Sequence, residues 1–146
     1  MRKMFMEQRK EVKNILVVDD ELDMLIFLSN LLMAEGFTVI EAKNGTEGIT
    51  KARKNPPALI ILDVMMSEES GIQIYRLLKF DKQLKRIPVI MLSAIDRDTF
   101  SHYQKFESSQ PGQSVPEPEA FLEKPPEAEE LINIVLELTS MDKNHD

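Results

Sequence analysis

The sequence predicts an α/β fold, with a doubly wound, five-stranded parallel sheet in the order 2-1-3-4-5 and helices on both faces. Short apolar runs rich in Val, Ile and Leu alternate along the chain with segments of helical periodicity. This alternation is typical of a parallel sheet that helices cover on both sides. Because crossover connections are right-handed, few strand orders remain, and we expect this common one.

The composition indicates one soluble domain. The chain has 146 residues, of which 42% are hydrophobic and 29% charged, with a formal net charge of −7. This charge argues against nucleic-acid binding, which needs clustered Lys and Arg. There is no cysteine, which excludes disulfides and thiolate metal sites. No apolar run approaches the ~18 residues of a membrane-spanning helix, and the N-terminus lacks a signal-peptide core. We therefore expect a cytoplasmic protein that does not contact the membrane.

Each predicted element has a local signal. The strands are expected over residues 15–18, 37–40, 59–62, 89–92 and 120–122. The helices are expected over about 21–35, 44–55, 71–80, 97–106 and 127–138. Gly36 is a favourable stop for the first helix, and Asn44 can cap the second, with Glu47 at the capping-box position. Pro56 and Pro57 end that helix, because proline cannot continue it.

The domain boundaries follow from the same reading. Residues 1–13 are charged and weakly patterned, so they form an N-terminal extension, and the domain occupies residues 14–140. Residues 141–146 form a polar tail. Four of the chain's Pro and Gly residues fall within 107–119, which therefore reads as a Pro-rich insertion in an extended surface loop.

Acidic residues follow two of the predicted strands. Asp19 and Asp20 come directly after the first strand, and Asp63 follows the third. In the order 2-1-3-4-5 these strands are neighbours, and sites in open α/β sheets form at such a switch point. Three carboxylates repel one another unless a cation lies among them. Oxygen ligands without His or Cys suit a hard ion, and Mg²⁺ is the usual choice where phosphate is handled.

Two further groups belong to the same edge of the sheet. Ser93 follows the fourth strand and Lys124 follows the fifth. A hydroxyl and an ammonium facing metal-bound carboxylates can hold a phosphoryl group through hydrogen bonds and charge neutralisation. A carboxylate can itself take up that group as the nucleophile, which gives an acyl phosphate.

These motifs, in this order and on these elements, resemble the receiver domain of two-component response regulators of the chemotaxis type, with its flavodoxin-like fold. The resemblance covers about residues 14–138. It implies that Asp63 is the phosphoacceptor and that Lys124 contacts the phosphoryl group. It also implies that Asp20 binds Mg²⁺ directly and Asp19 through water, with the backbone carbonyl of Met65 as a further ligand.

The resemblance also implies a conformational switch. Ser93 would close onto the phosphoryl group, and Phe121, three residues before Lys124, would rotate into the space that opens. The implied phosphodonor is a sensor histidine kinase or a histidine phosphotransfer protein. Because no residues are left for an output domain, we expect a stand-alone receiver that is not an enzyme. It would act on a protein effector of unknown identity, as a monomer or weak dimer.

The chain departs from the family pattern in three places. Ser67 stands where the family usually has Pro, which should loosen the loop after Asp63. Met65 and Ile95 occupy two positions that tune hydrolysis of the acyl phosphate, and both are apolar here. We expect them to obstruct the attacking water and to lengthen the phosphorylated lifetime. The insertion at 107–119 lies in the family's common output region, and could be a partner site or a plain loop.

Other interpretations remain open. A phosphatase of the haloacid dehalogenase type also uses Asp, Ser or Thr, and Lys, but it requires Asp-x-Asp where this chain has Asp19-Asp20-Glu21. A receiver-like interaction module that is never phosphorylated would keep the same fold. The acids could also be turn formers, and Asp63 and Lys124 could form a purely structural ion pair. No Gly-x-Gly-x-x-Gly follows the first strand, which argues against dinucleotide binding.

Overall fold

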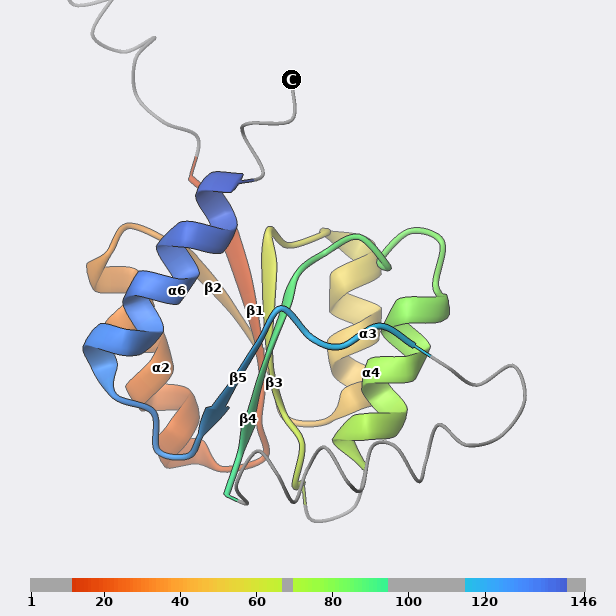
Figure 1. Cartoon of the computed structure of the whole chain (residues 1–146), viewed down its shortest axis with the longest axis horizontal. Coiled ribbons are helices and arrows are strands. Elements are labelled where there is room, and N and C mark those ends of the chain that lie inside the picture. Colours follow the sequence, from red (N-terminus) through yellow and green to blue (C-terminus); the bar gives the residue numbers. More distant parts are fainter. Residues whose placement is uncertain (1–11, 67–69, 95–114, 142–146) are drawn as a thin grey trace, which may run out of the picture.

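The five expected strands form one parallel sheet. The structure, a computed structural model, describes residues 12–66, 70–94 and 115–141, except the side chain of Met141. The strands are β1 (Asn14–Val18), β2 (Thr38–Ala42), β3 (Leu59–Asp63), β4 (Val89–Ser93) and β5 (Ala120–Glu123). Their order is β2-β1-β3-β4-β5 and every pairing is parallel (Figure 1). The predicted fold class and strand order are therefore confirmed.

Helices cover both faces of this sheet. The described helices are α2 (Leu22–Ala34), α3 (Gly45–Lys54), α4 (Gly71–Phe80) and α6 (Ala128–Met141). In Figure 1, α2 and α6 lie on one face and α3 and α4 on the other. Among the described residues no helix is long and apolar enough to cross a membrane.

Alternation along the strands builds two cores, one on each face. In β1, Leu16 and Val18 belong to the cluster that includes Ala52 of α3 and Tyr75 of α4. Ile15 and Val17 belong instead to the cluster on the other face, with side chains of α2 and α6. Successive strand residues point to opposite faces, so a strand covered on both sides is apolar along its interior, as residues 15–18, 59–62 and 89–92 are.

The predicted helix ends agree with the structure, with small shifts. Gly36 follows α2 with a φ of 96°, in the left-handed region that favours glycine. The Asn44 side chain caps α3 by accepting a 2.8 Å hydrogen bond from the Glu47 N–H. The Glu47 carboxylate reaches back to the N–H of Lys43, at 2.7 Å. This contact is one residue earlier than a standard capping box places it.

Helix α2 buries less of its apolar surface than its sequence suggests. Leu25, Leu28 and Leu32 are buried, and they pack against the sheet. The remaining large apolar side chains of this helix include four that are exposed: Leu22, Ile26, Phe27 and Met33. A stripe wider than one face of a helix cannot all reach the core, so α2 presents apolar side chains to solvent.

Part of the expected Pro-rich insertion is described and is fixed to the domain. The Tyr75 hydroxyl donates a 2.6 Å hydrogen bond to the carbonyl of Pro116, and Glu119 Oε1 accepts one of 2.8 Å from the Val89 N–H. Val115 packs against the core on the α3 and α4 face. The predicted helix 97–106 lies outside the described residues, as do the ranges 1–11, 107–114 and 142–146.

Candidate functional site

Three aspartates converge at the carboxyl ends of β1 and β3. Asp63 is the last residue of β3, and Asp19 and Asp20 directly follow β1. One carboxylate oxygen from each residue lies within 4.8 Å of the other two. Asp19 and Asp63 are buried, and Asp20 is not. The cluster expected at the switch point between these neighbouring strands is therefore present.

Asp63 is held on both sides of its carboxylate. Oδ1 accepts a 3.0 Å hydrogen bond from the Met65 N–H, and Oδ2 accepts one of 3.1 Å from Lys124 Nζ. The next residue, Val64, donates its N–H to the carbonyl of Leu92 in β4. Backbone pairing beyond the end of β3 thus fixes the direction in which the Asp63 side chain leaves the sheet.

A close backbone contact joins the start of α4 to the residues at the end of β3. The Gly71 N–H, at the start of α4, donates a 3.0 Å hydrogen bond to the carbonyl of Val64. A Cβ atom on Gly71 would lie 2.3 Å from Val64 Cα and 2.7 Å from the Asp63 carbonyl oxygen. Cβ atoms essentially never lie this close to backbone, so any other residue here would force α4 or the segment after Asp63 to shift. Ser70 caps the helix by accepting a hydrogen bond from the Gln73 N–H.

Lys124 enters the cluster from β5. Its N–H donates a 2.8 Å hydrogen bond to the carbonyl of Ser93, which places it just beyond the end of β4. Its ammonium nitrogen lies 2.7 Å from Glu21 Oε1, 3.0 Å from Asp19 Oδ2 and 3.1 Å from Asp63 Oδ2. The ammonium therefore bridges three carboxylates, two from the loop between β1 and α2 and one from the end of β3.

Glu21 is a member of the site that the sequence did not identify. Its carboxylate contacts the Lys124 ammonium, and the two residues are 103 positions apart in the chain. In the sequence Glu21 reads as a first-turn acid that complements the helix dipole. Its position directly after Asp19-Asp20 is the one signal that could have suggested a part in the site.

Burial and charge shape the protonation of this cluster. Burial raises the pKa of Asp19 from 3.8 to about 6; the nearby Asp63 charge adds to this, and the Glu21 N–H and Lys124 oppose it. Burial of Lys124 lowers its pKa, but the contacts with Glu21, Asp19 and Asp63 outweigh this and raise the pKa above its usual value. Lys124 is therefore charged at physiological pH, and the pKa of Asp19, at about 6, lies above the range of an ordinary carboxyl group.

The chemistry of the acid cluster fits a divalent ion. Asp19 Oδ2 is buried and close to Lys124, but it accepts no hydrogen bond of good geometry from the described residues. A buried carboxylate oxygen left this way is costly unless another group satisfies it. Oxygen-only ligands suit Mg²⁺, which keeps several waters of its own. A hydrated Mg²⁺ among Asp19, Asp20 and Asp63 would supply the missing donor.

The other expected site residues are placed as follows. Ser93 is buried at the end of β4, and Phe121 is half-buried in β5, opposite Met91 and packed against the core on the α3 and α4 face. The side chain of Met65 is exposed, beside the Asp63 loop. Ile95 and Ser67 lie outside the described residues.

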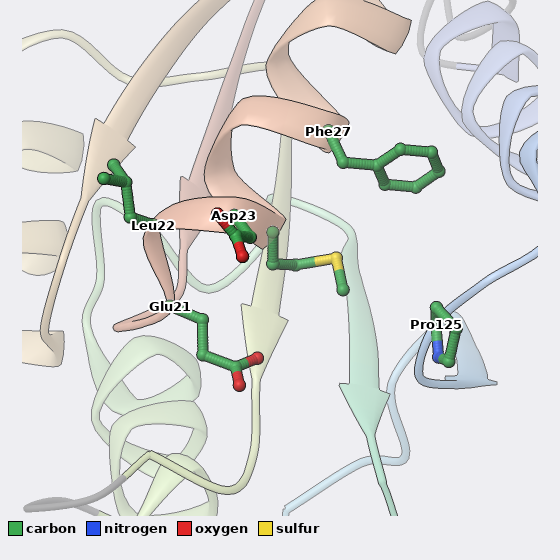
Figure 2. A pocket seen from close by; sticks show the side chains of 6 residues that line it. Glu21, Leu22, Asp23, Phe27 and Pro125 are labelled. Atoms are coloured by element: carbon green, nitrogen blue, oxygen red, sulfur yellow. The ribbon is translucent and has the colours of Figure 1, made fainter.

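An open pocket adjoins the site. Figure 2 shows it between the start of α2 and the segment after β5, with Glu21 and Asp23 on the helix side and Pro125 opposite. It has a volume of about 500 Å³, and its apolar wall includes Leu22 and Phe27. The acid cluster therefore lies beside a partly apolar surface, not in an enclosed cavity.

Comparisons with known proteins agree with this architecture. Residues 15–136 match the model of the response regulator receiver domain. The polar-differentiation response regulator DivK of Brucella anthropi is 39% identical over 83 residues, which are 56% of this chain and 67% of DivK.

Solved structures have the same fold. The receiver domain of a signal transduction histidine kinase from Syntrophus aciditrophicus superposes with a TM-score of 0.77 at 27% identity, over 92% of this chain and 96% of that one. A CheY-like receiver domain from Methanospirillum hungatei has a TM-score of 0.76 at 20% identity, over 93% of this chain and 100% of its own, which bears on the fold alone.

The parallel five-stranded fold, with an acid cluster and a lysine at one edge of the sheet, defines a receiver-type α/β domain. The chain belongs to the family of response regulator receiver domains. The resemblance noted in the sequence is therefore confirmed.

Proposed function

We propose that this chain accepts a phosphoryl group on Asp63 from the phosphohistidine of a sensor histidine kinase or of a histidine phosphotransfer protein. The reaction depends on Mg²⁺ and changes the surface that the domain presents. One observation supports this proposal above the others. Carboxylate oxygens of Asp63, Asp19 and Asp20 lie within 4.8 Å of one another, and the ammonium nitrogen of Lys124 lies 3.1 Å from Asp63 Oδ2. The membership of the receiver family supports it.

The proposed transfer uses Asp63 as the nucleophile and Lys124 as the neighbouring cation. A carboxylate oxygen of Asp63 attacks the phosphorus atom, and the phosphorus–nitrogen bond of the donor breaks as the new oxygen–phosphorus bond forms. The electron pair of the broken bond stays on the imidazole nitrogen, which takes up a proton from water, so the donor histidine ends as a neutral ring. Lys124, 3.1 Å from Asp63 Oδ2, stabilises the negative charge on the phosphoryl oxygens.

Asp19, Asp20, Asp63 and the Met65 carbonyl are the proposed metal ligands, with Asp19 acting through a bound water. The ion, when bound, neutralises charge on the phosphoryl oxygens and on the acids. Removal of Mg²⁺ by a chelator should therefore abolish phosphorylation.

Phosphorylation changes the surface of the domain through movements of Ser93 and Phe121. Ser93 closes onto the phosphoryl group, and the ring of Phe121 then turns inward. Because Phe121 has no hydroxyl, its two positions differ by packing alone, which provides the bistable element that a switch requires. The effector is a protein, since a net charge of −7 does not favour nucleic acid. We propose a cytoplasmic location and a monomer or weak dimer.

The exposed Met65 side chain makes the acyl phosphate long-lived by obstructing the attacking water. Replacement of Met65 by Asn supplies a polar group beside Asp63, so the decay of the phosphorylated form should become faster. Mass spectrometry at intervals after removal of the donor measures this rate. A decay rate that does not rise in Met65→Asn counts against this role.

Intact-mass analysis tests the main proposal. The wild-type chain and Asp63→Asn are incubated with acetyl phosphate and Mg²⁺. We expect a single phosphoryl adduct on the wild type and none on the variant. A wild type of unchanged mass would indicate an interaction module that is never phosphorylated, and an adduct that persists in Asp63→Asn would place the acceptor elsewhere.

A further inference from the structure

We infer that Glu21 is a positioning residue that holds the Lys124 ammonium before phosphorylation and competes with the phosphoryl group for it. This inference rests on the proposed function, because the competition concerns the group that Asp63 accepts. It adds to the site a residue with no metal-binding or nucleophilic role.

The distances show that Glu21 is the nearest partner of Lys124. The ammonium nitrogen lies 2.7 Å from Glu21 Oε1, against 3.0 Å for Asp19 Oδ2 and 3.1 Å for Asp63 Oδ2. The Glu21 side chain is 63% exposed, whereas those of both aspartates are 1% exposed. Lys124 thus has two inner partners and one outer partner at the rim of the site.

The backbone of Glu21 is held by a hydrogen bond, and its side chain does not cap the helix. Glu21 occupies the N-cap position of α2, with φ −96° and ψ 118°, but its side chain makes no capping hydrogen bond. Ser, Thr, Asp and Asn are the residues that cap well. The Glu21 N–H donates a 2.9 Å hydrogen bond to Asp19 Oδ1. A carboxylate on this anchored backbone is directed at Lys124 and not at the helix.

An ammonium has three protons, and three carboxylates already surround this one. Phosphorylation turns the Asp63 carboxylate into an acyl phosphate with several anionic oxygens, and these compete with Asp19 and Glu21 for the three protons of Lys124. Asp19 is buried, and an unpaired buried carboxylate is costly. Exposed Glu21 can return to water at little cost, because exposed ion pairs contribute little. Glu21 is therefore the partner that Lys124 releases.

The contact sets a modest barrier to phosphorylation. An ion pair with one exposed partner corresponds to a change of about two- to fivefold in a rate or equilibrium constant. Loss of the contact should speed transfer to Asp63 by that factor, because Lys124 is then free to meet the incoming phosphoryl group.

Three variants separate the contact from the charge. Glu21→Gln removes charge and ion pair together, and Glu21→Asp keeps the charge but shortens the side chain. Asp23→Asn is the matched control: Asp23 is an exposed acid in the first turn of the same helix, and no ion pair with Lys124 is found for it among the described residues.

The rate of phosphorylation by acetyl phosphate, which loses acetate as the phosphoryl group moves to Asp63, is measured with Mg²⁺ by intact mass. We expect Glu21→Gln and Glu21→Asp to be phosphorylated about two- to fivefold faster than wild type. The rate of each should also exceed the rate of Asp23→Asn. Equal rates in Glu21→Gln and Asp23→Asn would overturn the inference, since net charge alone would then explain the effect.

A second measurement observes the contact directly and does not depend on the chemistry. Exchange of the Lys124 ammonium protons with water, followed by nitrogen-15 NMR without phosphodonor, should be about two- to fivefold faster in both Glu21 variants than in wild type. Unchanged exchange overturns the inference. Thermal unfolding midpoints check that each variant is folded. If Glu21→Gln does not fold, the more conservative Glu21→Asp carries the test.

The two proposals fail in different ways. A wild-type chain that takes up no phosphoryl group overturns the proposed function, and the role of Glu21 in it falls as well. A wild type that is phosphorylated on Asp63, with Glu21 variants no faster than Asp23→Asn, overturns the role of Glu21 alone.

Discussion

The ammonium nitrogen of Lys124 lies 3.1 Å from Oδ2 of Asp63, although 61 residues separate the two in the chain. The parallel sheet makes this contact possible, since β3 and β5 end at the same edge with β4 between them. Lys124 thereby supplies positive charge among the acids. Several consequences of this arrangement can be measured.

Replacement of Lys124 by Ala should raise the affinity for Mg²⁺. The lysine charge repels the ion and occupies oxygens of Asp19 and Asp63, so its loss should tighten binding by about tenfold. Isothermal titration calorimetry measures this affinity. The control is Lys51→Ala, which removes an exposed ion pair with Glu47 on α3 and should leave it unchanged. Weaker binding in Lys124→Ala would mean that the lysine organises the acids and does not compete with the ion.

The binding of Mg²⁺ should weaken as the pH falls through about 6. The pKa of Asp19 is raised to about 6 in the folded, metal-free chain, from 3.8. Protons then compete with the ion for this carboxylate, because the ligand is the charged form. Titrations of Mg²⁺ across this range check the expectation. In Asp19→Asn the step near 6 should disappear, and its persistence would assign it to another group.

The same pKa shift predicts how stability without metal depends on pH. A raised folded pKa means that the contribution of Asp19 to stability is present below 3.8 and is lost as the pH rises through about 6. Without Mg²⁺, Asp19→Asn should therefore be more stable than wild type at neutral pH, by about 1 to 2 kcal/mol, and lose this advantage at low pH. Urea unfolding at several pH values measures the difference. A variant less stable than wild type at neutral pH would contradict it.

Gly71→Ala should both destabilise the domain and disturb the site. The added Cβ would lie 2.3 Å from Val64 Cα, and backbone cannot yield as a side chain can. We expect a loss of about 2 to 3 kcal/mol in the free energy of unfolding, with weaker Mg²⁺ binding, since Asp63 must move too. The control is Gly36→Ala, which has a φ of 96° but no atom within 4 Å of the new Cβ. It should cost about 1 kcal/mol of backbone strain and leave Mg²⁺ binding unchanged.

The elements that position the site could be predicted from the sequence because each has a strong local signal. Continuous apolar runs identify β1, β3 and β4, and an acid after two of them marks where the strands leave the core. Strand order then brings Asp19, Asp20 and Asp63 together without any knowledge of side-chain conformation. Hydrophobic periodicity and strand order depend on the pattern of apolar and polar residues along the chain, and a single sequence contains that pattern.

The contacts that depend on side-chain direction could not be predicted. The ion pair of Glu21 with Lys124 joins residues 103 positions apart and is made by one rotamer of a long side chain. The hydrogen bond from Tyr75 to the Pro116 carbonyl likewise fixes a segment that reads as a free surface loop. No periodicity records such contacts, because they depend on how two distant loops meet.

Ser93→Ala should separate phosphorylation from signalling. The variant keeps Asp63 and Lys124, so the phosphoryl adduct should still form, but without the hydroxyl nothing draws β4 toward it. The NMR signals of the Phe121 ring should then shift on phosphorylation in wild type and stay in place in Ser93→Ala. The exposed Ser140 of α6 offers the control Ser140→Ala, which should respond as wild type does. If the ring shifts fully in Ser93→Ala, the change at Phe121 does not pass through Ser93, and another link between Asp63 and β5 must carry it.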